Sequence, residues 1–188
     1  MFTLTLGLSL FFALHSLREF GWREGLVSRH GASIYKTFLA IGIVLSIALI
    51  VIGKSNAGFI QIWVPPFNLR SLTHLLMISS CILIAAGILP ASYTRSLLLH
   101  PMLTGVLVWG TSHLLANGDL ASILLFGSLS VWSVYKYLYL ERHKDKQAPQ
   151  AAPSFVWDAA AILLGMFAYI VLLVFHGQLF GFALSTIL

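Results

Sequence analysis

Six long apolar runs constrain this chain more than any other feature. Each is close to the roughly 20 residues that a helix needs to cross the hydrocarbon core of a bilayer. The runs cover residues 1–17, 33–53, 71–90, 96–116, 120–140 and 156–175. Hydrophobic residues make up 59% of the 188 residues and charged residues only 9%, which excludes an ordinary soluble domain. The sequence predicts an all-α, polytopic integral membrane bundle of about six transmembrane helices, forming a single domain over residues 1–188.

The distribution of Lys and Arg predicts how the chain is oriented. Membrane proteins hold these residues in cytoplasmic loops. The first, third and fifth connections and their flanks carry nine of them: Arg18, Arg23, Arg29, Lys36, Arg95, Lys136, Arg142, Lys144 and Lys146. The second carries Lys54 and Arg70, and the fourth carries none. We expect both termini to lie outside or in the periplasm, and the net charge of +5 to reflect orientation and not binding to nucleic acid.

Three further features bear on the organisation of the chain. Residues 141–154 have the composition of a polar, flexible linker, which this orientation places in the cytoplasm. The first run lacks a basic start and a small-residue cleavage site, so we expect it to be retained and not removed as a signal peptide. The single cysteine, Cys81, excludes an intramolecular disulfide and a Cys-x-x-Cys metal or haem-attachment motif.

Histidines at membrane depth are the strongest functional signal, because ionisable groups inside a bilayer are costly. Five of the seven lie within or at the edge of an apolar run: His15, His74, His100, His113 and His176. His30 and His143 belong to basic loops and are expected to be solvated. The predicted topology places His74, His113 and His176 towards the periplasmic face. Imidazoles without nearby Cys, Asp or Glu suit a transition metal, or a haem held by one or two of them.

The stretch from His100 to Asp119 contains most of these polar residues. His100 precedes Pro101 at an expected helix start, where it is either a cap or a site residue. His113 lies about 20 Å further along the same helix at 1.5 Å per residue, so the two cannot share a ligand. Small residues surround His113, leaving room for close helix contacts or a flat group: Gly105, Gly110, Thr111 and Ser112. Residues 117–119, "NGD", predict a tight turn, since Asn and Gly tolerate a positive φ, and Asp119 is expected to cap the next helix.

Three segments together resemble one family. They read "HPMLTGVLVWGTSHLLANGDLASILLFG" over residues 100–127, "LHSLREFGWREGLVSRHGASIY" over residues 14–35 and "FHGQLFG" over residues 175–181. The pattern is similar to that of the NnrU family of bacterial membrane proteins, which also includes the plant and cyanobacterial 15-cis-zeta-carotene isomerases. The polar "HLLANGDLAS" segment places this chain closer to the bacterial branch than to the isomerases.

The resemblance implies a cofactor and a pair of ligands. The isomerase relatives are membrane haem b enzymes in which two histidines are implicated in iron coordination, and His15 and His113 occupy the matching positions. The bacterial branch takes its name from association with nitrite and nitric oxide reductase genes. The resemblance therefore implies a haem b protein with a redox or nitrogen-oxide-linked role and a membrane reductase partner.

Three other interpretations stay open beside this one. The first is a haem-dependent cis–trans isomerase of a polyene, and the second is a non-catalytic membrane accessory protein. The third is a membrane methyltransferase of the isoprenylcysteine type, whose "RHP" motif the "HP" of residues 100–101 resembles. Leu99 stands where that motif has arginine, and we expect no later glutamate to complete it, which disfavours the methyltransferase.

Overall fold

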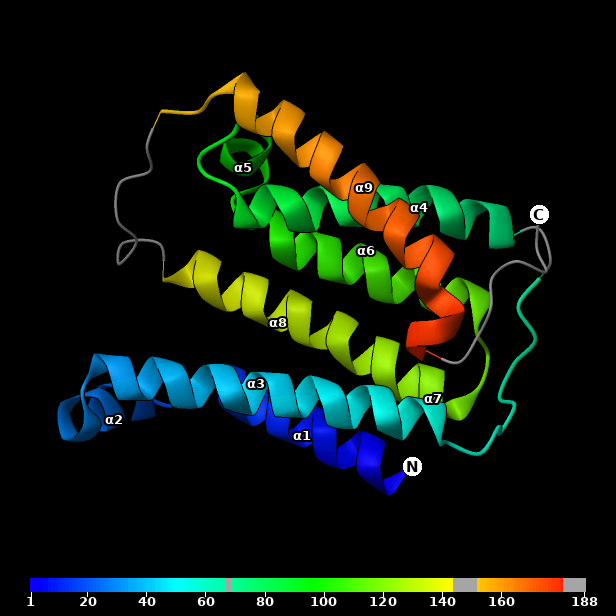
Figure 1. Ribbon diagram of the computed structural model, residues 1–188, viewed down its shortest axis with the longest axis horizontal. Coiled ribbons are helices and arrows are strands. Elements are labelled where there is room, and N and C mark those ends of the chain that lie inside the picture. Colours follow the sequence, from blue (N-terminus) through cyan, green and yellow to red (C-terminus); the bar gives the residue numbers. More distant parts are fainter. Residues whose placement is uncertain (67–68, 144–151, 181–188) are drawn as a thin grey trace. The chain divides into compact units, whose positions relative to one another are not determined.

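The computed structural model describes residues 1–66, 69–143 and 152–180, and within these residues the fold is helical with no strand (Figure 1). A single bridge between Gln61 and Asp119 is the exception. The helices are α1 (Phe2–His15), α2 (Trp22–His30), α3 (Ala32–Ser55), α4 (Leu69–Ile88), α5 (Tyr93–Leu98), α6 (Pro101–Ala116), α7 (Leu120–Ser122), the π-helix η1 (Ile123–Gly127), α8 (Ser128–Arg142) and α9 (Phe155–Phe180). They form two compact units, residues 1–60 and 61–188.

The first unit is an antiparallel pair, α1 and α3, joined by α2. Glycines let the two long helices approach closely. A Cβ at Gly53 would lie 2.6 Å from the Cα of Leu4, and one at Gly7 would lie 2.8 Å from the backbone nitrogen of Ile50. Both contacts are too short for any larger residue, so these glycines set the spacing of the helices.

In the second unit, α6 packs antiparallel to both α4 and α8, as Figure 1 shows. Close glycine contacts again define the packing. A Cβ at Gly105 of α6 would lie 2.8 Å from Cγ1 of Ile84 of α4. The buried hydroxyl of Ser80 donates a hydrogen bond of 2.8 Å to the carbonyl oxygen of Gly105. Gly165 of α9 allows a similar close approach to α4, because a Cβ at Gly165 would lie 2.6 Å from the backbone nitrogen of Ile82.

The six apolar runs each correspond to a helical segment, which confirms the all-α membrane fold. Three segments are long and apolar enough to cross a membrane on their own: Ala32–Ser55, Leu120–Arg142 and Phe155–Phe180. Of the other three, α4 has 20 residues, as many as the run that predicted it, whereas α1 and α6 are shorter than their runs. With 14 and 16 residues, α1 and α6 extend about 21 and 24 Å, less than the roughly 30 Å of a hydrocarbon core.

The expected fourth span is the clearest difference. The run over residues 96–116 is not one helix, because α5 ends at Leu98 and α6 begins at Pro101. Leu99 has a φ of +57°, and the backbone nitrogen of His100 lies 2.5 Å from the carbonyl oxygen of Leu98, which is a tight γ-turn. The first connection also contains the helix α2, where we expected a loop. Most of the predicted linker at 141–154 lies outside the described residues.

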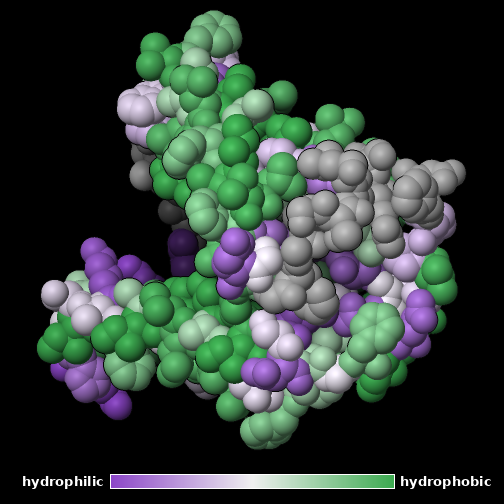
Figure 2. Space-filling model, turned by 45° about the vertical axis from the view of Figure 1, so that its right-hand side comes forward, coloured by the Kyte–Doolittle hydropathy of each residue, from purple (hydrophilic) through white to green (hydrophobic). Residues whose placement is uncertain are grey.

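The outer faces of the long helices are apolar, as the extensive green areas in Figure 2 show. On α9, Leu163 and Phe167 are 72% and 65% exposed, and on α3, Phe38 and Val44 are 74% and 68% exposed. Such a surface is unfavourable in water and stable against lipid tails. It is the surface of a membrane-embedded protein.

Candidate functional site around His113

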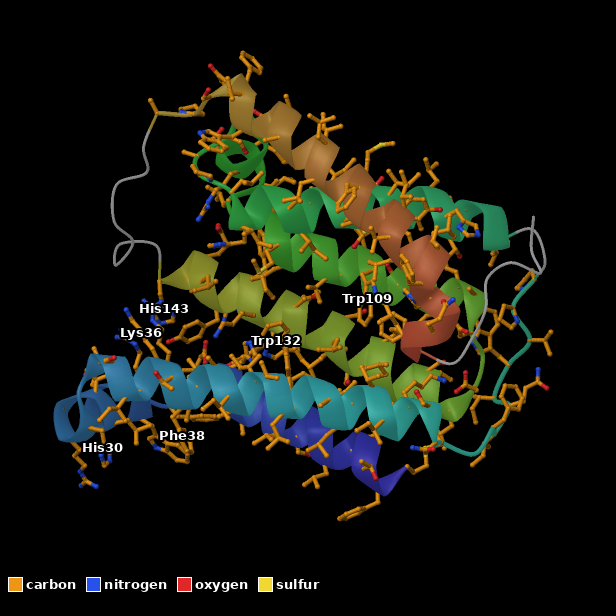
Figure 3. All side chains as sticks on the ribbon, viewed as in Figure 1. His30, Lys36, Phe38, Trp109, Trp132 and His143 are labelled. Carbon is orange, nitrogen blue, oxygen red and sulfur yellow. The ribbon has the colours of Figure 1, made fainter. Side chains whose placement is uncertain are left out.

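His113 lies near the end of α6 inside a group of aromatic rings. Its ring is stacked on that of Phe126, with centroids 4.2 Å apart and planes inclined by 24°. Trp109, labelled in Figure 3, lies one turn earlier, 5.0 Å from the imidazole and edge-on to Phe126 at 4.8 Å. The rings of Phe126 and Trp109 hold the imidazole in one orientation.

A hydrogen bond fixes which nitrogen of His113 carries the proton. Nδ1 lies 2.9 Å from the backbone carbonyl oxygen of Trp109. Because a carbonyl oxygen can only accept, Nδ1 must donate, and the lone pair of the neutral ring then lies on Nε2. Metal-bound histidines are commonly oriented by this kind of second hydrogen bond.

The π-helix η1 places Phe126 against α6. Each backbone hydrogen bond of a π-helix joins residues five apart, one more than in an α-helix. Such π-helical turns are frequent at functional sites. The carbonyl oxygen of Phe126 accepts a 2.7 Å hydrogen bond from the buried hydroxyl of Ser130. A Cβ at Gly110 would come within 2.8 Å of that carbonyl oxygen. The glycine therefore lets η1 approach α6 closely enough for Phe126 to reach His113.

The "NGD" turn anchors this end of α6. Asp119 caps α7, as expected, because its carboxylate accepts from the backbone nitrogen of Ser122 at 3.0 Å and from the Ser122 hydroxyl at 2.5 Å. Neither Asn117, with a φ of −126°, nor Gly118 uses the positive φ that its residue type tolerates. Gly118 is required for a different reason. Its carbonyl oxygen accepts from the backbone nitrogens of Ile62 and Trp63, which brings this extended segment too close for a Cβ.

His15, the other predicted ligand, has the same local geometry in the first unit. Its Nδ1 lies 2.9 Å from the carbonyl oxygen of Phe11, and the two rings are stacked at 4.0 Å. The proton is again fixed on Nδ1, so Nε2 carries the lone pair. His15 is the last residue of α1, at the end of an apolar helix.

The remaining intramembrane histidines have different surroundings. The ring centroid of His176 lies 5.1 Å from that of Phe180. Nδ1 of His74 is bound instead to the hydroxyl of Tyr169 at 2.9 Å. Among the residues that the structure describes, no three His, Cys, Asp or Glu side chains could jointly hold a metal ion. A haem held by one or two imidazoles does not require such a group.

His100 is the N-cap residue of α6, but its side chain makes no capping hydrogen bond. Its Nε2 lies 3.7 Å from Oε1 of Glu141, and its ring lies edge-on to Tyr137 at 5.5 Å. The expectation that no later glutamate would approach the "HP" motif is therefore wrong. His30 and His143 are exposed, as expected.

Reasoning from the sequence missed Phe126, Tyr169 and Glu141. The contact of Phe126 with His113 could have been predicted. Helices joined by the short turn at 117–119 must pack antiparallel, which brings residues on either side of the turn together. The contact of Tyr169 with His74 could not have been predicted, because 95 residues of sequence separate the two.

Comparison with known proteins agrees with the motifs. The family described as NnrU protein matches residues 3–184, nearly the whole chain. No curated protein and no solved structure matches it. The chain therefore belongs to the NnrU family of membrane proteins.

Proposed function

We propose that this chain is a haem b-binding membrane protein in which His113 is an iron ligand. His15 is the second candidate ligand. The proposal rests on the orientation of His113, whose Nδ1 is bound to the Trp109 carbonyl oxygen so that Nε2 carries the lone pair a metal needs. His15 has the same arrangement with Phe11. Bound haem would supply reversible one-electron chemistry at its iron.

The surroundings of His113 suit a flat, apolar cofactor. Phe126 and Trp109 provide aromatic faces, and the buried residues Gly110 and Ser112 provide small side chains nearby. A metal-binding imidazole in such surroundings is shielded from water, which favours the neutral form that coordinates metal. In this account Phe126 orients the imidazole, and Trp109 fixes its tautomer.

His143 shows that the hydrogen bond alone does not make a site. Its Nδ1 also lies close to the carbonyl oxygen four residues earlier, that of Tyr139 at 2.7 Å, and its ring is stacked on Tyr139 at 4.3 Å. His143 is exposed, however, just after α8 ends (Figure 3). It supplies a control with matched local geometry and a different environment.

We further propose a redox role linked to nitrogen-oxide metabolism in a bacterial inner membrane, with a membrane reductase as partner. Membership of the NnrU family supports this role. A haem-dependent polyene isomerase is the alternative, and incubation of the reduced protein with 15-cis-zeta-carotene separates the two. Formation of the isomerised product would replace the redox role by the isomerase.

An absorption spectrum tests the cofactor. The full chain is expressed with an adequate supply of haem, purified in detergent and measured in its oxidised and reduced forms. We expect a Soret band that shifts on reduction. Protein that is folded but shows no Soret band would contradict the proposal.

A further inference from the structure

His74 differs from His15 and His113 in the group to which its ring nitrogen Nδ1 is hydrogen-bonded. The Nδ1 atoms of His15 and His113 are bound to backbone carbonyl oxygens, which only accept and so fix the tautomer. Nδ1 of His74 is bound to the hydroxyl of Tyr169 at 2.9 Å. A hydroxyl both donates and accepts, so the proton of His74 can lie on either ring nitrogen. Nε2 of His74 can therefore donate in one tautomer and accept in the other.

The pair lies at membrane depth. His74 is five residues into α4, about 7.5 Å from its start at helical rise. Tyr169 is 14 residues into α9 and 11 residues from its end, about 21 and 16 Å along a helix that is long enough to span a membrane. The phenol therefore lies far from both ends of its helix, where water does not reach.

The surface next to the pair is apolar and exposed. On α4, Leu72 and Leu75 are 42% and 62% exposed, and on α9, Phe167 and Ile170 are 65% and 52% exposed. His74 and Tyr169 themselves are neither fully buried nor fully exposed. A lipid-soluble molecule can reach them from the bilayer.

A purely structural role explains this pair poorly. Helices α4 and α9 are already held together by the close contact of Gly165 with Ile82, and Asp158 of α9 accepts two backbone hydrogen bonds just after α4, from Tyr93 and Thr94. Polar bonds between membrane helices add little to their association. An ionisable group at this depth, by contrast, usually marks a functional site.

We propose that His74 binds the head group of a membrane quinone and that Tyr169 positions the His74 ring. The oxidised head group presents a carbonyl oxygen, which accepts a hydrogen bond from Nε2 of His74 in one tautomer. The reduced head group presents a hydroxyl, which donates to Nε2 in the other tautomer, while Nδ1 donates to the oxygen of Tyr169. The exposed apolar residues of α4 and α9 provide a surface for the isoprenoid tail. This site does not depend on bound haem.

Binding of decylubiquinone to the full chain in lipid nanodiscs tests the proposal. Quenching of tryptophan fluorescence is measured as the quinone is added, and saturable quenching is separated from the linear quenching that partition into lipid produces. Tyr169→Phe keeps the ring and removes the hydroxyl, and His74→Leu removes the imidazole. The matched control is Tyr139→Phe with His143→Leu, the same residue types at the exposed end of α8.

We expect saturable binding by the unaltered chain and roughly fivefold to tenfold weaker binding by His74→Leu, as loss of one hydrogen bond to the head group predicts. Tyr169→Phe keeps that bond and loses only the hydroxyl that positions His74, so we expect a smaller loss of about twofold to fivefold. The control should bind within about twofold of the unaltered chain, since its residues lie outside the site. Purely linear quenching by the unaltered chain, or equal affinities for His74→Leu and the control, would overturn the proposal. Haem content is read separately from the Soret band, so failure of the quinone site and failure of the haem proposal are distinguished.

Discussion

The imidazole of His113 lies against the ring of Phe126, with centroids 4.2 Å apart and ring planes inclined by 24°. Phe126 belongs to the π-helix η1, and Gly110 of α6 provides the space that this approach requires. The orientation of the proposed iron ligand is therefore determined by a neighbouring helix as well as by its own. Four predictions test this account.

Phe126→Leu removes the ring that orients His113 and keeps an apolar side chain. An aromatic pair contributes about 0.5–1.5 kcal/mol, so we expect roughly twofold to tenfold faster loss of haem. Transfer of haem to an excess of an apo-globin measures the rate. Phe167→Leu, on the exposed side of α9, is the control and should behave as the unaltered chain does. Equal rates for the two variants would show that Phe126 does not orient the ligand.

Gly118→Ala should destabilise the second unit. The new Cβ would lie 2.8 Å from the carbonyl carbon of Trp63, which cannot move away while Ile62 and Trp63 donate to the Gly118 carbonyl oxygen. We expect a loss of about 1–3 kcal/mol, as in other overpacked sites. Thermal unfolding in detergent measures it. At Gly127 a Cβ meets nothing within 4 Å, so Gly127→Ala should be neutral or stabilise by up to about 1 kcal/mol. A Gly118→Ala protein as stable as Gly127→Ala would contradict the described turn.

Close packing should matter more than hydrogen bonding between α4 and α6. Gly105→Val would force branched methyl groups against Ile84 and the Ser80 carbonyl oxygen, which a Cβ alone would approach to 3.0 Å, and should cost about 1–3 kcal/mol. Ser80→Ala removes the 2.8 Å hydrogen bond to the Gly105 carbonyl oxygen and should cost about 0.6 kcal/mol, the average in membrane proteins. Thermal unfolding of both variants in the same detergent shows which substitution lowers the stability more. The reverse order would mean that the hydrogen bond dominates.

The sequence predicted the helices well because length and apolarity alone decide which segments lie in a bilayer. The cap at Asp119 was also predictable, since a carboxylate before an apolar run binds free backbone nitrogens wherever that run folds as a helix. The start of α6 at Pro101 was predictable too, because proline suits the first turn of a helix, but the positive φ of Leu99 was not, because a leucine carries no turn signal. Pairs such as His74 and Tyr169 depend on how whole helices pack, which one sequence does not specify.

The Soret absorbance of His113→Ala and His143→Ala, purified side by side with the same haem supply, tests the central claim most directly. The two histidines share the bond from Nδ1 to the preceding turn and a stacked aromatic ring, and they differ in environment. We predict that His113→Ala abolishes or shifts the Soret band, because an iron ligand is lost, and that His143→Ala leaves the band unchanged. Identical Soret bands in the two variants would contradict the assignment of His113 as a haem ligand.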